Sequence, residues 1–436
     1  MRYRAIGLVL AVLLVGMPLA LRGQAVPSTV QQPNGSAESQ STGPNSPLDD
    51  TMEAGEAEAE VFSRKLVKWN HYDGKYFTIR MGGGFLLDYA GTAQDENSKQ
   101  QVVIKPDWKI RDSRLMLNGR LKFKRDVTWT AGIMYDGYKR AWLVRQTGIM
   151  IKVPEILGYL FIGRAKEGIS LNKVMVGYAG WTMERATISD ALIPILADGV
   201  QWLGYAPKQH FIWTAGFYGD SLSEGQSFST YRNQGVGRFA FVPLESEKTV
   251  LHLGFSARYG KPKDGMLQAR SRPELNTAPY FIDTGKFPCD STTTWAMEAY
   301  YRPGPFLLGT EYFVQQTNAP KVGNPVFHGG DAVFTWLATG ETRSYNTRGG
   351  FFNQISPLHS VYQGGPGAWE LVTRFSYTDL DSGTLRGGKF WRFTPMVNWY
   401  LSDNIRLEMA YGYGSLDRFN RIGHTQFFQT RLQLQF

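Results

Sequence analysis

The sequence has few of the features from which disulfide-bonded, metal-binding and helical membrane proteins are built. Its one cysteine, Cys289, cannot form an internal disulfide, and its six histidines have no spacing typical of a metal site. No stretch after residue 25 is apolar for long enough to form a transmembrane helix, so any membrane span must be a β-strand. No histidine stands near a nucleophile, and we expect neither an enzyme nor a bound cofactor or metal.

The N-terminus has the pattern of a signal peptide, residues 1–25. Arg2 and Arg4 form a basic start, Ala5–Leu21 is apolar, and Gly23-Gln24-Ala25 offers a cleavage site after Ala25. The alternative is an uncleaved anchor helix. Residues 26–75 are predicted to be a periplasmic linker, because much of this segment is rich in Ser, Gly, Pro, Asn and Gln, with room for a short helix in its acidic, Ala-rich part.

An extended hairpin over residues 112–136 shows the pattern that recurs along the chain. One face of its first arm carries Leu115, Leu117, Leu121 and Phe123. Successive side chains of a strand point to opposite faces, so the alternation predicts one apolar and one polar face. The polar face is basic, with Met116 as its one apolar member. In a soluble sandwich the apolar face would form the core, whereas in a transmembrane barrel it would contact lipid.

From residue 76 to the end, the chain contains about sixteen such strands, an even number, as in bacterial outer-membrane barrels. The connections mostly alternate between short and long, which is typical of periplasmic turns and external loops. The connection 340–367 is an exception, because it is long but falls on the periplasmic side. Either a strand is missed there or the turn is extended. We therefore predict an all-β, antiparallel transmembrane β-barrel over residues 76–436.

The distribution of charge favours a barrel over a soluble sandwich. In the clearest strands the apolar face carries no charged residue. An Arg or Lys at the bilayer midplane costs roughly 2–4 kcal/mol, so a lipid-facing surface requires this restriction. The chain also ends on Phe436, after the apolar alternation of Phe428, Leu432 and Leu434. We expect the outer-membrane assembly machinery to recognise this terminal aromatic, and we place the protein in the outer membrane of a Gram-negative-type bacterium.

Several ordered motifs carry a resemblance to a known family. They are Arg111-Asp112-Ser113-Arg114-Leu115 with Gly119, Gly163-Arg164-Ala165-Lys166-Glu167, Met183-Glu184-Arg185, Thr339-Gly340-Glu341-Thr342-Arg343-Ser344-Tyr345, Gly367-Ala368-Trp369-Glu370-Leu371 and Asn398-Trp399-Tyr400. With these motifs the sequence resembles the phosphate-selective porin O and P family, from about residue 76 to the end. The resemblance implies a sixteen-stranded, homotrimeric outer-membrane channel with a basic, anion-selective pore.

The predicted anion-binding residues lie on the polar strand faces and in the third external loop, 164–199. In porin-like barrels this loop folds inward and narrows the lumen. Guanidinium groups can hold phosphate oxygens through two hydrogen bonds, while Lys acts as a movable point charge. The predicted residues are Arg80, Arg114, Arg120, Lys122 and Lys124 in the wall, and Arg164, Lys166, Lys173 and Arg185 in the loop.

The loop differs from those of the most selective family members, because it is nearly balanced in charge and contains few Arg. We therefore predict passive diffusion of phosphate and other small anions through a water-filled channel, with a general porin as the alternative. For Glu184 and Arg185, a structural ion pair is preferred over a contact with solute. The other hypotheses are a structural or adhesive barrel and a barrel hydrolase. No nucleic acid partner is expected.

Overall fold

The computed structural model describes residues 69–436, except 137–139 and 221–229. The predicted signal peptide and the predicted linker up to residue 68 lie outside the described residues. Within the described part of the chain, no helix is long and apolar enough to cross a membrane.

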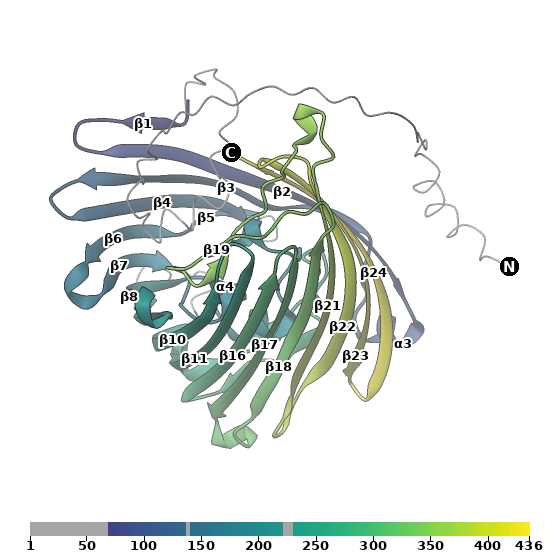
Figure 1. Ribbon diagram of the computed structural model, residues 1–436. Helices are drawn as coiled ribbons and strands as arrows, with labels where there is room; N and C mark the ends of the chain where they lie inside the picture. Colours follow the sequence, from purple (N-terminus) through teal and green to yellow (C-terminus); the bar gives the residue numbers. More distant parts are fainter. Residues whose placement is uncertain (1–68, 137–139, 221–229) are drawn as a thin grey trace, which may run out of the picture. The chain divides into compact units, whose positions relative to one another are not determined.

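The described residues form a closed antiparallel β-barrel of sixteen strand positions, as the sequence predicted (Figure 1). Strands β5 and β6 both pair with β4 and occupy one position, on either side of a break at Arg145 and Gln146. Strand β2 pairs with β24, from Gly84 opposite Gln435 to Gln94 opposite Thr425, and this pairing closes the barrel. The short strand β1 (His71–Asp73) adds to the start of β2.

The strands of the barrel are long on one side of the molecule and short on the other. The long strands are β2 (Thr78–Gln94), β3 (Asp107–Lys122), β10 (Tyr231–Glu245), β11 (Thr249–Pro262), β16 (Ser291–Pro303), β17 (Phe306–Asn318), β18 (Val326–Leu337), β21 (Ala368–Ser382), β22 (Leu385–Tyr400), β23 (Ile405–Arg418) and β24 (Arg421–Gln435). The shorter strands are β4 (Asp126–Asp136), β5 (Ala141–Val144), β6 (Thr147–Val153), β7 (Gly158–Ala165), β8 (Ala197–Ala206) and β9 (Phe211–Gly219).

The connections contain only small elements in the residues that the structure describes. The helices are α3 (Glu96–Gln101), α4 (Leu171–Val174) and α5 (Thr187–Leu192), and the 3₁₀ turns are η1 (Pro154–Ile156), η2 (Gly177–Ala179), η3 (Pro207–Gln209), η4 (Lys263–Gly265), η5 (Pro320–Val322) and η6 (Val361–Gln363). The two-residue strands are β12 (Met266–Leu267), β13 (Arg270–Ser271), β14 (Ile282–Asp283), β15 (Phe287–Pro288), β19 (Tyr345–Asn346) and β20 (Phe351–Phe352).

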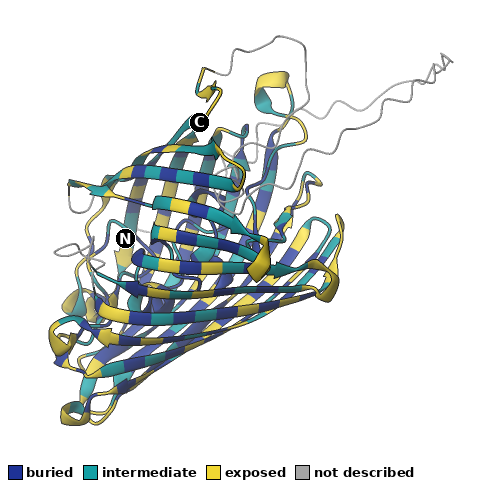
Figure 2. Ribbon diagram, turned by 90° about the vertical axis from the view of Figure 1, so that its left-hand side faces the viewer, coloured by how far each residue is buried: buried dark blue, intermediate teal, exposed yellow. Residues whose placement is uncertain are grey.

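The strands have an outer and an inner face, and exposed and buried residues alternate along them (Figure 2). In β3, Leu115 and Leu117 are exposed on the outside, while Asp112 and Met116 are buried on the inside. In β24, Phe428 and Leu434 are likewise exposed, and Arg431 is buried. The faces predicted from the alternation are confirmed.

Replacing Leu117 with Arg tests this face assignment. Leu117 is 37% exposed on the outer face, where an Arg at the middle of the bilayer would be destabilising by about 2–4 kcal/mol. We expect a matching loss in the free energy of unfolding, measured by denaturant titration in lipid vesicles. The neighbouring Asn118→Arg variant is the control, because it puts the same charge on the inner face. Equal losses in both variants would contradict the assignment.

One end of the barrel, here called the turn side, carries most of the short connections and the C-terminus. The other end, the loop side, carries the long ones. The exception predicted at 340–367 is an extended turn, residues 338–367, which contains β19, β20 and η6 and joins β18 to β21. We call it the turn-side segment. The predicted long loop at 379–388 is wrong, because β21 and β22 pair as far as Ser382 and Leu385 and leave only Gly383 and Thr384 between them.

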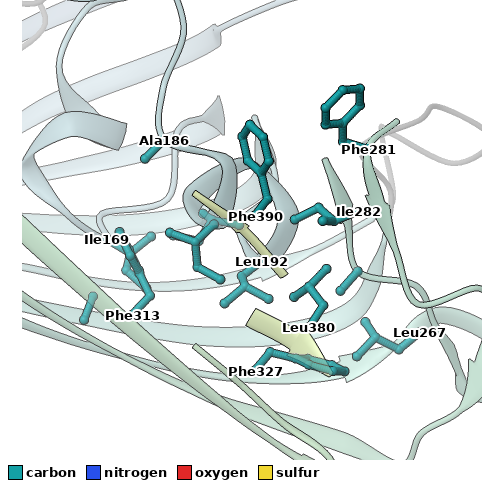
Figure 3. Close-up of a cluster of buried hydrophobic side chains, with 14 of the residues drawn as sticks. Ile169, Ala186, Leu192, Leu267, Phe281, Ile282, Phe313, Phe327, Leu380 and Phe390 are labelled. Carbon is teal, nitrogen blue, oxygen red and sulfur yellow. The ribbon is translucent and has the colours of Figure 1, made fainter. Parts of the chain in front are cut away.

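The interior of the barrel is partly filled by inward-folded chain. Residues 263–290, between β11 and β16, fold inward and contribute Phe281 and Ile282 to a buried cluster that also contains Leu192, Phe313 and Phe390 (Figure 3). A second buried cluster joins Trp181 and Leu171 to Phe351 and Phe352 of the turn-side segment. The open part of the lumen is therefore smaller than the cylinder of strands.

Candidate anion passage

The loop between β7 and β8, residues 166–196, runs inside the barrel, as predicted. We call it the inward loop. It contains α4, η2 and α5, and most of its apolar side chains are buried. Much of its path is fixed through its backbone carbonyls, which accept hydrogen bonds from side chains of the wall and of the turn-side segment. These bonds are Gln433 to Tyr178 O (3.1 Å), Arg343 to Ala179 O (2.9 Å), Arg406 to Gly180 O (2.8 Å), Asn398 to Trp181 O (2.9 Å), Arg431 to Met183 O, and Arg374 to Glu184 O (2.7 Å).

Arg343 joins three parts of the molecule. It lies in the turn-side segment and donates to the carbonyls of Ala179 in the inward loop and of Asn353 in its own segment, each at 2.9 Å. Its Nη2 also donates to the carboxylate of Glu370 on β21 at 2.8 Å and to Tyr400 on β22 at 3.2 Å. Both charged groups are almost completely buried, so each depends on the other for compensation of its charge.

Two wall carboxylates hold the start of α4. The carboxylate of Glu311 on β17 accepts from the hydroxyl of Ser170 and the backbone N–H of Asn172, both at 2.8 Å. Glu298 on β16 accepts from the backbone N–H of Leu171 at 2.5 Å. The first turn of a helix has unpaired N–H groups, which these carboxylates satisfy. The inward loop is therefore attached to the wall on several sides.

Between the inward loop and strands β2, β3 and β6–β9 lies a cavity of about 180 Å³, which we call the turn-side cavity. Asn404, Gln435 and Phe436 line it at the turn side. Among the described residues, its lining contains four basic residues and no Asp or Glu. The basic residues are Arg80, Arg114, Arg145 and Lys166.

The guanidinium of Arg114 is held in a fixed orientation. Its Nε donates to Asp112 at 3.1 Å, and its guanidinium carbon lies 4.3 Å from the centre of the Tyr178 ring. Tyr178 can approach the wall because residue 84 is glycine, where a Cβ would lie 2.5 Å from the ring. Asp112 uses one side of the guanidinium, and Tyr178 covers a face of it. Any side chain at position 84 would therefore collide with the Tyr178 ring.

Lys166 is surrounded by positive charge. Burial and the charges of Arg185, Arg145 and Arg114 lower the pKa of Lys166 well below its ordinary value. Its ammonium donates to the carbonyl of Met175. A bound anion would reduce the repulsion among these groups, which is the electrostatic condition for an anion site.

We expect the anion preference of the channel to rise as pH falls through the lowered pKa of Lys166. Protonation adds one positive charge to the turn-side cavity. It occurs at a pH below the ordinary lysine pKa, which is about 10.4. Reversal potentials in a KCl gradient, measured over a pH series, report the change. Lys166→Gln should remove this pH-dependent change in the reversal potential. Lys124→Gln, in an exposed turn, should keep it. The same change in Lys166→Gln would assign the titration to another group.

A second cavity, of about 850 Å³, lies at the loop side and is called the loop-side cavity. It is lined by parts of the inward loop and of residues 263–290, with five basic and five acidic side chains. Glu184 lies in its lining and accepts from Arg111 at 2.8 Å and from Arg431 at 2.6 Å. Burial opposes the ionisation of Glu184, but the two Arg outweigh it and lower its pKa to about 2. The predicted pair of Glu184 with Arg185 is wrong, because the Arg185 side chain reaches the carbonyls of Asn172 and Met175 instead.

The structure separates the nine predicted anion-binding residues. Arg80, Arg114 and Lys166 line the turn-side cavity. Arg120 lies on the inner face of β3 and lines neither the turn-side cavity nor the loop-side cavity. Four others are engaged elsewhere or lie at the rim: Lys122 pairs with Asp73 at 2.5 Å, Lys124 is exposed in the β3–β4 turn, Arg164 is buried against Asp198 at 2.6 Å, and Lys173 pairs with Asp190 at 2.8 Å. Arg185, described above, lines neither cavity.

Two features of the cavity were missed in the sequence. Arg145 follows the outward-facing Val144 and is buried on the inner face. The alternation of Trp142 and Val144 could have identified it, had the faces of this strand been assigned. Tyr178 could not have been identified from the pattern, because its position depends on the fold of the inward loop over Gly84.

The closed barrel, the inward loop and the outward apolar face define an outer-membrane porin. Solved outer-membrane proteins show the same fold. The anion-selective porin from Comamonas acidovorans aligns with a TM-score of 0.51 at 12% identity, over 83% of this chain and 100% of that one. The trimer form of OmpT from Vibrio cholerae aligns with a TM-score of 0.53 at 11% identity, over 83% and 100%.

The family is shown by a sequence model. The chain belongs to the family "Phosphate-selective porin O and P", whose model matches residues 79–436. Porin O of Pseudomonas aeruginosa is 25% identical over 247 residues, which are 49% of this chain and 55% of that protein. The chain spans about half the length of the curated relatives it matches. The protein is therefore an outer-membrane member of this porin family, as the sequence predicted.

Proposed function

We propose that this channel prefers anions and admits phosphate and other small anions by passive diffusion. The observation that supports the proposal is the turn-side cavity, whose lining has four basic residues and no carboxylate in the part of the chain that the structure describes. A water-filled passage with low-dielectric walls concentrates the field of such charges and raises the local concentration of anions. Weak, serial sites allow ions to leave as well as enter, and bases on separate strands and a loop supply them.

A general porin of low selectivity is the second candidate. The loop-side cavity supports it, because its five basic and five acidic residues balance. The inward loop has no dense run of Arg, so phosphate need not bind more tightly than chloride. A structural or adhesive barrel is a third candidate, since inward-folded chain fills much of the lumen.

Planar-bilayer recordings separate the three candidates. The proposal expects discrete conductance steps, a reversal potential that favours chloride over potassium in a KCl gradient, and reduction of the chloride current by added phosphate. Steps without anion preference, or without an effect of phosphate, would point to the general porin. If no steps are seen with protein that shows the heat-modifiable mobility of a folded barrel, the channel proposal is overturned.

We further propose that the chain is a homotrimer, that its residues 1–25 are cleaved after Ala25, and that 26–75 lie in the periplasm. The family and the trimeric form of the structurally similar OmpT support the trimer. Light scattering in detergent tests the trimer. N-terminal sequencing of the mature protein tests the cleavage after Ala25. The terminal Phe436 is proposed to engage the assembly machinery, and its deletion should reduce the amount of folded protein in the outer membrane.

A further inference from the structure

The lining of the turn-side cavity has a large apolar part besides its four bases. Strands β3, β6, β7 and β8 each contribute an apolar side chain, and the turn-side segment contributes one more. They are Met116, Met150, Phe161, Leu203 and Phe351. A site built only for a compact, strongly hydrated ion gains nothing from such a surface, because apolar groups do not replace the water of hydration.

Two of the four bases lie apart from most of the apolar side chains. Arg80 and Arg114 lie on β2 and β3, with Met116 beside Arg114, whereas Arg145 and Lys166 stand just before β6 and just after β7. Met150, Phe161 and Leu203 lie on the neighbouring β6, β7 and β8. A solute with a charged group at one end and an apolar body at the other therefore has a partner for each end.

The size of the cavity indicates how large a part of a solute it can hold. Its volume is about 180 Å³, and a dry protein cavity of about 150 Å³ accepts benzene. A single ring with one acidic group matches this scale. Two of the apolar residues, Met116 and Met150, have flexible thioether side chains that adapt to irregular shapes and make favourable contacts with aromatic rings.

We propose that the turn-side cavity binds organic anions with an apolar body, such as a carboxylate on a single aromatic ring. The bases hold the carboxylate, and the Met and Phe side chains cover the ring. This proposal rests on the proposed anion preference and names a class of solute for the same cavity.

The test compares two carboxylates of equal charge, benzoate and acetate, as blockers of the chloride current in planar bilayers. We expect benzoate to halve the current at a concentration at least about tenfold lower than acetate does. Equal concentrations would overturn the proposal. The reversal potential in KCl, recorded in the same membranes, tests the anion preference separately, so failure of the proposed function is seen independently of the comparison of blockers.

Substitutions then test the location. Met116→Gln with Met150→Gln exchanges two apolar side chains for polar ones of similar length and leaves every charge in place. The advantage of benzoate over acetate should fall to less than about threefold, with an unchanged reversal potential. Met266→Gln, in the loop-side cavity, is the matched control and should keep the full advantage. The single variants are measured as well, in case the double variant does not fold. Loss of the advantage in Met266→Gln, or its persistence in both turn-side variants, would overturn the assignment to this cavity.

Discussion

A variant with Arg114→Glu and Arg145→Glu is expected to lose most of the anion preference of the channel. The two changes lower the formal charge of the residues that line the turn-side cavity by four, to zero. The field of the lining acts on ions in a confined, low-dielectric passage, so its removal has a large effect on permeation. The measurement is the reversal potential in a KCl gradient, which should move towards zero or change sign.

A matched control exists on the same hairpin. Lys122→Glu with Lys124→Glu changes the charge by the same amount, but neither residue lines the turn-side cavity or the loop-side cavity. This variant should keep most of the anion preference. Equal effects of the two double variants would mean that total charge, and not the turn-side cavity, sets the selectivity. Arg114→Gln with Arg145→Gln gives a milder form of the first variant, without a new carboxylate beside Asp112.

Arg343→Ala is expected to have the largest effect on stability and to loosen the inward loop. It leaves the carboxylate of Glu370 buried without its cation and removes donors from the carbonyls of Ala179 and Asn353. Loss of one partner of a buried ion pair is destabilising by about 3–5 kcal/mol. Denaturant unfolding in lipid vesicles measures this loss, and single-channel recordings should show larger fluctuations of the current.

A second variant of the same contact, and a control at another arginine, separate the loss of stability from the loosening of the loop. Arg343→Ala with Glu370→Gln removes the unpaired charge and should recover part of the stability, while the current fluctuations remain. Arg386 donates to the nearby carbonyls of Gly383 and Leu385, and Arg386→Ala should change neither the stability nor the current fluctuations. Stable, quiet channels in Arg343→Ala would show that other contacts hold the loop.

The fold was predictable from the sequence because lipid constrains every second residue of a strand. The alternation in Leu115 to Phe123 and in Phe428 to Phe436 is visible without any knowledge of neighbours, and it gave both the strand class and the faces. The ends of strands were less predictable. Gly383 and Thr384 make a tight turn, but the polar residues around them resemble a long loop.

The site was only partly predictable, because a basic residue on the inner face can serve the solute or the protein. Arg406 and Arg431 have the same sequence pattern as Arg114, yet they hold backbone carbonyls of the inward loop. These partners are more than 200 positions away in the chain, at Gly180 and Met183. No local pattern distinguishes the two uses, since the choice depends on how the loop lies within the lumen.

The hydrogen bonds from the wall to the carbonyls of residues 178–184 have a consequence for redesign of the pore. A carbonyl is present at every position whatever the side chain, so these bonds specify where the loop runs without specifying its sequence. Side chains of the loop that face the passage can therefore be substituted while the backbone of the loop keeps its path. A library of loop substitutions in an unaltered barrel would vary which solutes the pore admits, while the path of the inward loop stays the same.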